Sequence, residues 1–165
     1  MSALTYSWFM EARTLHAPLN ALSAATRPQG IEIATLTTFD IPALAVLTLE
    51  AYGDDVTPEA LLETSEELRL TFEGAFGATT EDSFVGAWDG GTLVGAILVV
   101  RESPWDDAPD DPFVVDLIVA PDYRRRGIAT ALVAEVAGRC ASWGFGSLAL
   151  RLDSRHGGAN ELYSV

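Results

Sequence analysis

The sequence predicts a mixed α/β domain, and three features support this. Asp89-Gly90 is a strong hairpin signal between two apolar segments, residues 84–88 and 92–101, which predicts two antiparallel strands. Residues 113–119 are almost wholly apolar, as expected of a central strand. Residues 128–143 carry apolar side chains at helical spacing before Gly144, which predicts an amphipathic helix. At 165 residues the chain has the length of one ordinary domain.

The first 30 residues are expected to form an N-terminal arm ahead of a domain that spans residues 31–165. Pro18 interrupts a set of apolar residues at helix-like spacing, namely Trp8, Leu15, Leu19 and Leu22. Such an arm either packs on its own domain or docks onto a second protomer. A homodimer is therefore one of the two arrangements that the sequence leaves open.

Residues 31–72 predict a strand followed by two helices. Residues 31–37 alternate between apolar and polar side chains, as in a half-buried strand. Asp40 can cap a first helix that has Pro42 in its first turn and ends at Gly53. Thr57-Pro58 then signals the start of a second helix, with an apolar stripe opposite several glutamates. That stripe consists of Leu61, Leu62, Leu68 and Phe72.

The charge of the chain is strongly negative and unevenly distributed. Its ten basic residues are all arginine, against 24 acidic residues, for a net charge of −14. Absence of lysine excludes a phosphate-binding P-loop, and the negative charge argues against nucleic-acid or membrane partners. Residues 31–111 hold 18 acidic residues and two arginines, whereas residues 112–165 hold five acidic residues and six arginines. This division suits an enzyme that joins an anionic cofactor to a cationic substrate, but solvated helix faces would give the same count.

The cysteine count and the apolar segments indicate a cytoplasmic protein. Cys140, the only cysteine, cannot form an internal disulfide and falls on the apolar face of its predicted helix, which favours a core position. The N-terminus has no signal-peptide pattern, and the longest apolar stretch, residues 93–100, is too short to span a bilayer. No zinc-binding pattern occurs, so we expect no metal. The GxSxG motif of a nucleophile elbow does not occur either.

The segment between the central strand and the amphipathic helix has the properties of an anion site. Helix-start N–H groups and the positive end of the helix dipole favour an anion, and Gly127 leaves room for close approach. Ala129 keeps the next turn small, and three arginines add positive charge: Arg124, Arg125 and Arg126.

Arg124, Gly127 and Ala129 match the pattern Gln/Arg-x-x-Gly-x-Gly/Ala, and the chain here resembles motif A of the GNAT acyltransferase superfamily. The resemblance extends from residue 31 to the C-terminus, including an Ala-x-x-Leu-Tyr segment at residues 159–163. It implies a twisted, mostly antiparallel sheet that is splayed at the cofactor site, with helices on both faces.

The resemblance also implies acetyl-CoA as acyl donor. Its pantetheine arm would bond to strand backbone at Leu117, Ile118 and Val119. Its pyrophosphate would bind the loop and first helical turn, that is Arg124, Arg125, Arg126, Gly127, Ile128, Ala129 and Thr130.

Three kinds of residue are candidates for the chemistry. By resemblance, the Tyr163 hydroxyl lies beside the cofactor sulfur and acts as general acid on the leaving thiolate. Asp116 is the first candidate for the base that deprotonates the amine, because it shares a strand face with Val114 and Ile118; pairing with an arginine such as Arg151 is the alternative. Asp54 and Asp55 lie in the loop where, by resemblance, family members bind the acceptor, and they are the second candidates for the base.

The expected function is transfer of an acetyl group from acetyl-CoA to a primary amine, by direct attack. A non-catalytic module that binds acyl-CoA as a sensor is the alternative. Residues 147–153 predict a last strand and Gly158 the start of a helix, but family members continue beyond the tyrosine to at least one further strand. We therefore expect missing residues, another chain or the N-terminal arm to complete the sheet.

Overall fold

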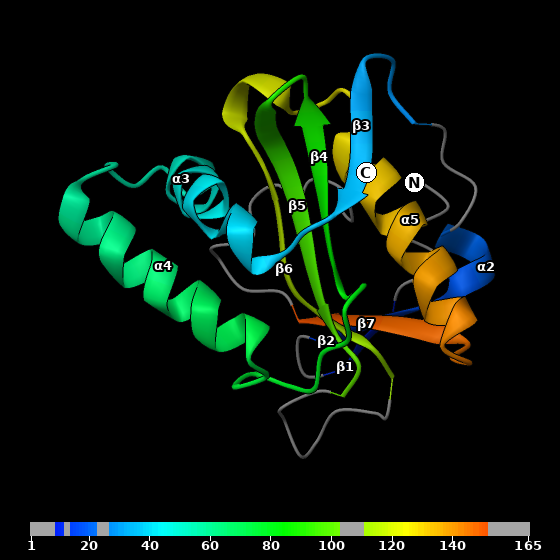
Figure 1. The fold of residues 1–165 in the computed structure, drawn as a ribbon. Helices are drawn as coiled ribbons and strands as arrows, with labels where there is room; N and C mark the ends of the chain where they lie inside the picture. Colours follow the sequence, from blue (N-terminus) through cyan, green and yellow to red (C-terminus); the bar gives the residue numbers. More distant parts are fainter. Residues whose placement is uncertain (1–8, 12–13, 23–26, 103–110, 152–165) are drawn as a thin grey trace.

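A computed structural model of the chain describes residues 9–11, 14–22, 27–102 and 111–151. Within these residues one seven-stranded sheet has the order β1-β2-β7-β6-β5-β4-β3 (Figure 1). All neighbouring strands are antiparallel except β6 and β7. Helices cover both faces, with α3 and α4 on one side and α5 on the other (Figure 1). The predicted mixed α/β fold is confirmed.

Four antiparallel strands, with β3 at the edge, form one side of the sheet. β4 (Phe84–Asp89) and β5 (Thr92–Val100) are joined by the predicted turn, in which Gly90 has a φ of +60°. β3 (Ile31–Thr35) pairs with the outer side of β4, and β6 (Phe113–Val119) with β5. β6 has the bounds predicted from its apolar run and is largely buried, because helices cover both of its faces.

Helices α3 (Ile41–Ala51) and α4 (Pro58–Phe72) pack together on one face. A short 3-10 turn, η1 (Thr38–Asp40), precedes α3. The Thr57 hydroxyl caps α4 by accepting a hydrogen bond from the Ala60 N–H at 3.1 Å, as predicted. Leu68 is buried, but Leu62 is 73% exposed, so the predicted apolar stripe is wrong at Leu62. The inward face of α4 follows the helical period from Leu61, which leaves Leu62 on the outer side.

On the opposite face, α5 (Ile128–Ser142) follows a second 3-10 turn, η2 (Pro121–Tyr123). Four of the five apolar residues predicted to face the core are buried, namely Ile128, Leu132, Val136 and Cys140, and the fifth, Trp143, is partly buried against the same core. Cys140 is a core side chain, as predicted, and its burial raises the pKa of the thiol to about 12. The helices of the described residues are too short or too polar to span a bilayer.

The N-terminal region forms part of the same sheet. β1 (Phe9–Glu11) pairs with β2 (Thr14–Pro18), and β2 pairs along its whole length with β7 (Ser147–Arg151). The short helix α2 (Leu19–Leu22) follows, and its buried leucines join the core beneath α5. The helix-like spacing of apolar residues is therefore misleading at Leu15, which lies in β2. Trp8, the first residue of that pattern, lies outside the described residues. A domain boundary at residue 30 stays a prediction.

Candidate active site

Within the described residues, which end at Arg151 in β7, the sheet opens between β6 and β7. Within the described residues these parallel strands pair at only two positions, Phe113 with Ala149 and Val114 with Leu150. β5, in contrast, pairs with β6 as far as Val119. Alternate backbone groups of a strand point to each edge, so residues 116–119 have groups directed toward the opening. The backbone predicted to bind pantetheine, at Leu117, Ile118 and Val119, lies along it.

The loop after β6 leads directly to an uncapped helix start. Gly127 is the N-cap of α5 with a φ of +83°, and no side chain among the described residues bonds there as a cap. The first intrahelical bond of α5 runs from the Ala131 N–H to the Gly127 carbonyl at 3.0 Å. The amides of Ile128, Ala129 and Thr130 therefore have no intrahelical acceptor. Together with the helix dipole they form a site for an anion.

The three arginines of this loop have different surroundings. Arg124 is half-buried, and its guanidinium donates to the Val119 carbonyl at 3.1 Å and to the Ala51 carbonyl at 2.6 Å. Arg125 is exposed and has a φ of +63°, the only positive φ of a non-glycine residue in the described chain. Such backbone strain, of order 1–3 kcal/mol, often marks functional loops. Arg126 is exposed, with its guanidinium 4.8 Å from the centre of the Tyr123 ring.

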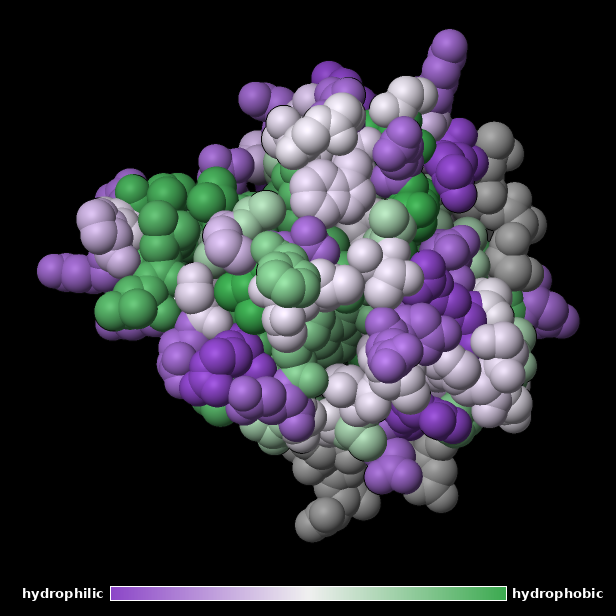
Figure 2. Space-filling view, viewed as in Figure 1, coloured by the Kyte–Doolittle hydropathy of each residue, from purple (hydrophilic) through white to green (hydrophobic). Residues whose placement is uncertain are grey.

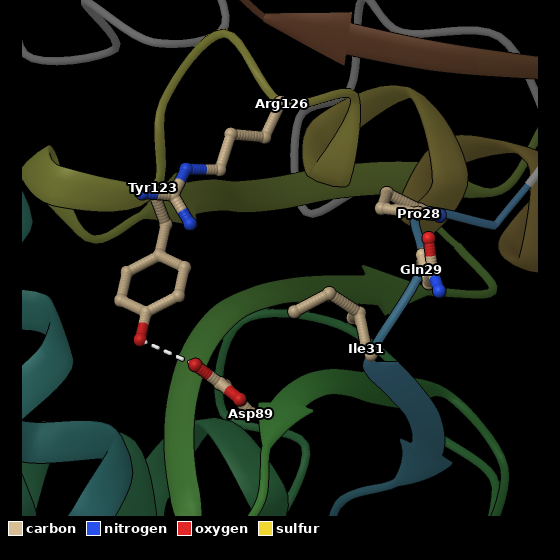
Figure 3. A pocket seen from close by; sticks show the side chains of 7 residues that line it. Pro28, Gln29, Ile31, Asp89, Tyr123 and Arg126 are labelled. Atoms are coloured by element: carbon tan, nitrogen blue, oxygen red, sulfur yellow. Dashed lines mark hydrogen bonds between the residues drawn. The ribbon is translucent and has the colours of Figure 1, made fainter.

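Arg126 and Tyr123 also line a pocket of about 340 Å³ beside the start of α5 (Figure 3). Its other walls come from residues 28–31, ahead of and at the start of β3, and from Asp89 at the end of β4. The Tyr123 hydroxyl donates to the Asp89 carboxylate at 2.6 Å, and this bond raises the pKa of Tyr123 (Figure 3). The phenol therefore stays protonated and is held in place beside residues 124–127, the loop predicted to bind the cofactor (called the cofactor loop below).

Asp116 lies where β6 leaves β7, beside a β-bulge. Leu98 of β5 pairs with Asp116 and Val99 with Val114, so Val115 is an extra residue of β6. The bulge directs Val114 into the core beneath α5, whereas Asp116 lies on the face of α3 and α4 with Ile118. The expectation that Asp116 shares a face with Val114 is therefore wrong, although the shared face with Ile118 is confirmed.

Tyr52 is a partner of Asp116 that sequence reasoning missed. Its hydroxyl donates to Oδ1 of Asp116 at 2.5 Å. The two residues are 64 positions apart, and no local pattern connects them. The alternative partner Arg151 has its side chain outside the described residues.

The two residues predicted to bind the acceptor amine come shortly after Tyr52 in the chain, following Gly53. Asp54 and Asp55 are exposed in the loop between α3 and α4. Asp116 lies on the same side of the sheet as α3, which this loop follows.

Part of the acidic surface on α4 is neutralised locally. Hydrophilic side chains gather over the C-terminal half of α4 (Figure 2). There Arg69 forms ion pairs with Glu66 and Glu73, and its hydrogen bond lowers the pKa of Glu66. These pairs are exposed and behave as ordinary helix-surface pairs.

Tyr163, the predicted general acid, lies outside the described residues. Its role stays a prediction from the resemblance.

Comparison with known proteins identifies the family. The sequence model of the acetyltransferase (GNAT) family matches residues 46–164. The match covers more than two thirds of the chain, so the protein belongs to this family. No curated protein matches the sequence.

Solved structures show the same fold at low sequence identity. The PaiA N-acetyltransferase of Thermoplasma acidophilum, in complex with coenzyme A, is 18% identical with a TM-score of 0.60, over 82% of this chain and 87% of its own. The ribosomal-protein-S18-alanine N-acetyltransferase of Escherichia coli is 18% identical with a TM-score of 0.57, over 81% of this chain and 74% of its own.

A GCN5-related N-acetyltransferase of Sphaerobacter thermophilus is 23% identical with a TM-score of 0.61, over 86% of this chain. The chain spans only 42% of that protein's length, and 37% of the length of a similar chain from Pyrococcus horikoshii.

Proposed function

We propose that this protein transfers the acetyl group of acetyl-CoA to a primary amine, by direct attack of the amine on the thioester. The observation that supports this most is the continuity of the opening between β6 and β7 with the uncapped start of α5. The extended pantetheine arm with its thioester would fit the opening, and the pyrophosphate would fit the start of α5. The coenzyme A complex of the Thermoplasma relative is consistent with this donor.

The chain offers distinct groups for the two parts of acetyl-CoA. Backbone N–H and C=O groups of residues 117–119 would bond to the pantetheine amides. The amides of Ile128, Ala129 and Thr130 would bind the pyrophosphate. Arg125 and Arg126 are exposed and supply charge, whereas Arg124 mainly holds the loop against α3.

The acceptor amine would enter from the α3 side, where Asp116 lies. A protonated amine must lose a proton before it attacks, and Asp116, held by the Tyr52 hydroxyl, would accept that proton. The amine nitrogen then bonds to the acetyl carbon as the carbon–sulfur bond breaks. Backbone N–H groups of β6 at the opening stabilise the charge on the acetyl oxygen. Tyr163 would protonate the departing thiolate, so no covalent enzyme intermediate is needed.

A cationic acceptor, either a small amine or an amine of a peptide, fits the surface best. Asp54 and Asp55 are exposed beside Tyr52. Several carboxylates of one sign near a cleft raise the encounter rate of a cation, although each contributes little alone.

The test is an assay of thiol release from acetyl-CoA with a panel of small amines, polyamines and peptides. Release that depends on the amine supports the proposal. Binding of coenzyme A by calorimetry, with no release across the whole panel, would instead favour the non-catalytic acyl-CoA-binding module. The buried Cys140 adds little background to a thiol reagent, because it is the only cysteine and is 0% exposed.

A further inference from the structure

The contact between Tyr52 and Asp116 joins the end of a helix to the mouth of the sheet opening. Tyr52 is the residue that ends α3, and its half-buried ring packs against the core on that face. Its hydroxyl bonds to Asp116 at 2.5 Å, beside the bulge of β6. A carboxylate that is held by a donor on one oxygen has a fixed orientation, which a proton acceptor needs.

The backbone around Tyr52 is itself held firmly. Gly53, with a φ of +75°, allows α3 to end in a Schellman motif. In that motif the Gly53 N–H bonds to the Glu50 carbonyl at 3.2 Å and the Asp54 N–H to the Leu49 carbonyl at 2.9 Å. The next carbonyl, that of Ala51, accepts the hydrogen bond from Arg124 at 2.6 Å.

Arg124 connects this helix end to the cofactor loop. Its guanidinium also bonds to the carbonyl of Val119, the last residue of β6. A planar guanidinium with fixed donor directions is suited to hold two carbonyls at once, which an ammonium does less well. Continuous contacts therefore run from the cofactor loop through Arg124 and the end of α3 to Asp116.

We propose that Tyr52 is a positioning residue for the base Asp116, and that Arg124 maintains this position by holding the end of α3 against the cofactor loop. This inference rests on the proposed function. The Tyr52 hydroxyl donates a hydrogen bond to the carboxylate and keeps its own proton, so Tyr52 acts through Asp116 and not on the reacting atoms. Arg124 thereby has a role in catalysis that is separate from supplying positive charge to the pyrophosphate.

Tyr52→Phe tests the first half, because it keeps the ring and removes only the hydroxyl. A hydrogen bond to a charged group contributes enough to change a rate about tenfold. We expect kcat to fall about tenfold, while the KM for the amine and the Kd for acetyl-CoA change less than about twofold. The matched control is Thr48→Val, which removes a hydroxyl of the same helix that bonds to the Leu44 carbonyl at 2.7 Å. This control should leave kcat unchanged.

A double-mutant cycle with Asp116→Asn decides whether Tyr52 acts through Asp116. In that background Tyr52→Phe should lower kcat by less than about twofold. An equal loss in both backgrounds, or a loss that appears only in KM, would overturn the proposal.

Arg124→Lys tests the second half at saturating acetyl-CoA. We expect kcat to fall, and we expect Tyr52→Phe to add little to that fall. Arg139→Lys is the control, since Arg139 also bonds to a backbone carbonyl, that of Asp82 at 2.9 Å, but lies outside the proposed site. An unchanged kcat in Arg124→Lys would refute the role of Arg124. The same follows if the fold-losses in kcat of Arg124→Lys and Tyr52→Phe multiply in the double variant.

Failure of the proposed function would be recognised separately. If the wild-type protein releases no thiol with any amine, that function is wrong, and urea unfolding then tests the contact. Changes in unfolding free energy that are additive for Tyr52→Phe and Asp116→Asn would overturn the inference, and strong non-additivity would support it.

Discussion

Gly127 gives the most direct test of the cofactor loop. Its φ of +83° lies in the left-handed region, where a residue with a Cβ costs about 1–2 kcal/mol. Among the described residues, a Cβ built there meets only the Cγ of Pro28, at 3.8 Å, which is an ordinary contact. Gly127→Ala should therefore lower the free energy of unfolding by about 1–2 kcal/mol without changing the fold. Urea unfolding measures this difference.

Gly127→Glu should have a similar backbone cost but a much larger effect on coenzyme A. The new carboxylate lies at the positive end of α5 and obstructs the amides of its first turn. Loss of one hydrogen bond to a charged phosphate costs about 1.5–3 kcal/mol, so we expect the Kd to rise roughly 10- to 100-fold. Titration calorimetry with coenzyme A measures this Kd.

Gly138→Glu is the matched control for that measurement. Gly138 is exposed on the same helix, has no positive φ, and a Cβ there meets nothing within 4 Å. The substitution adds the same charge away from the loop and should leave coenzyme A affinity unchanged. An unchanged Kd in Gly127→Glu as well, with the fold intact, would refute the assignment of the pyrophosphate to this loop.

Three further predictions concern the chemistry and the surface. Tyr163→Phe should lower turnover about 100-fold with coenzyme A affinity intact, and wild-type turnover would show that another group protonates the thiolate. With a cationic acceptor, kcat/KM should fall as salt rises and fall again in the Asp54→Asn/Asp55→Asn variant; kinetics indifferent to both changes would leave these residues as ordinary surface. Because burial raises the pKa of Cys140 to about 12, a thiol reagent at pH 8 should label it only after unfolding, and rapid labelling of the native protein would contradict this.

Local sequence patterns predicted the strands and helices whose stability depends on neighbours nearby in sequence. The β4–β5 hairpin, β6 and α5 have nearly the predicted bounds, since turn chemistry and periodic burial act within a few residues. The loop before α5 was also recognisable, because its glycine and arginines stand together in the chain.

The features that the sequence did not predict depend on distant contacts. β2 is extended because it pairs with β7, and this pairing overrides the helix-like spacing that includes Leu15. The bulge at Val115 reverses which side chains share a face, and no residue of a uniformly apolar strand signals it. Tyr52 is absent from the predicted site for the same reason, since its contact with Asp116 exists only once α3 packs on β6.

The pairing of β2 with β7 also has a consequence for how the protein folds. Its partners are 129 to 137 positions apart, and they supply most of the strand pairing that holds β7 in the sheet. Such pairing raises the contact order, because the entropy of closing a very long loop is lost before any contact forms. The hairpin and α5 can form early, while β7 finds its second neighbour only when distant parts of the chain meet. We therefore expect coenzyme A binding to recover later than helix content in stopped-flow refolding, and simultaneous recovery would show that β7 docks without β2.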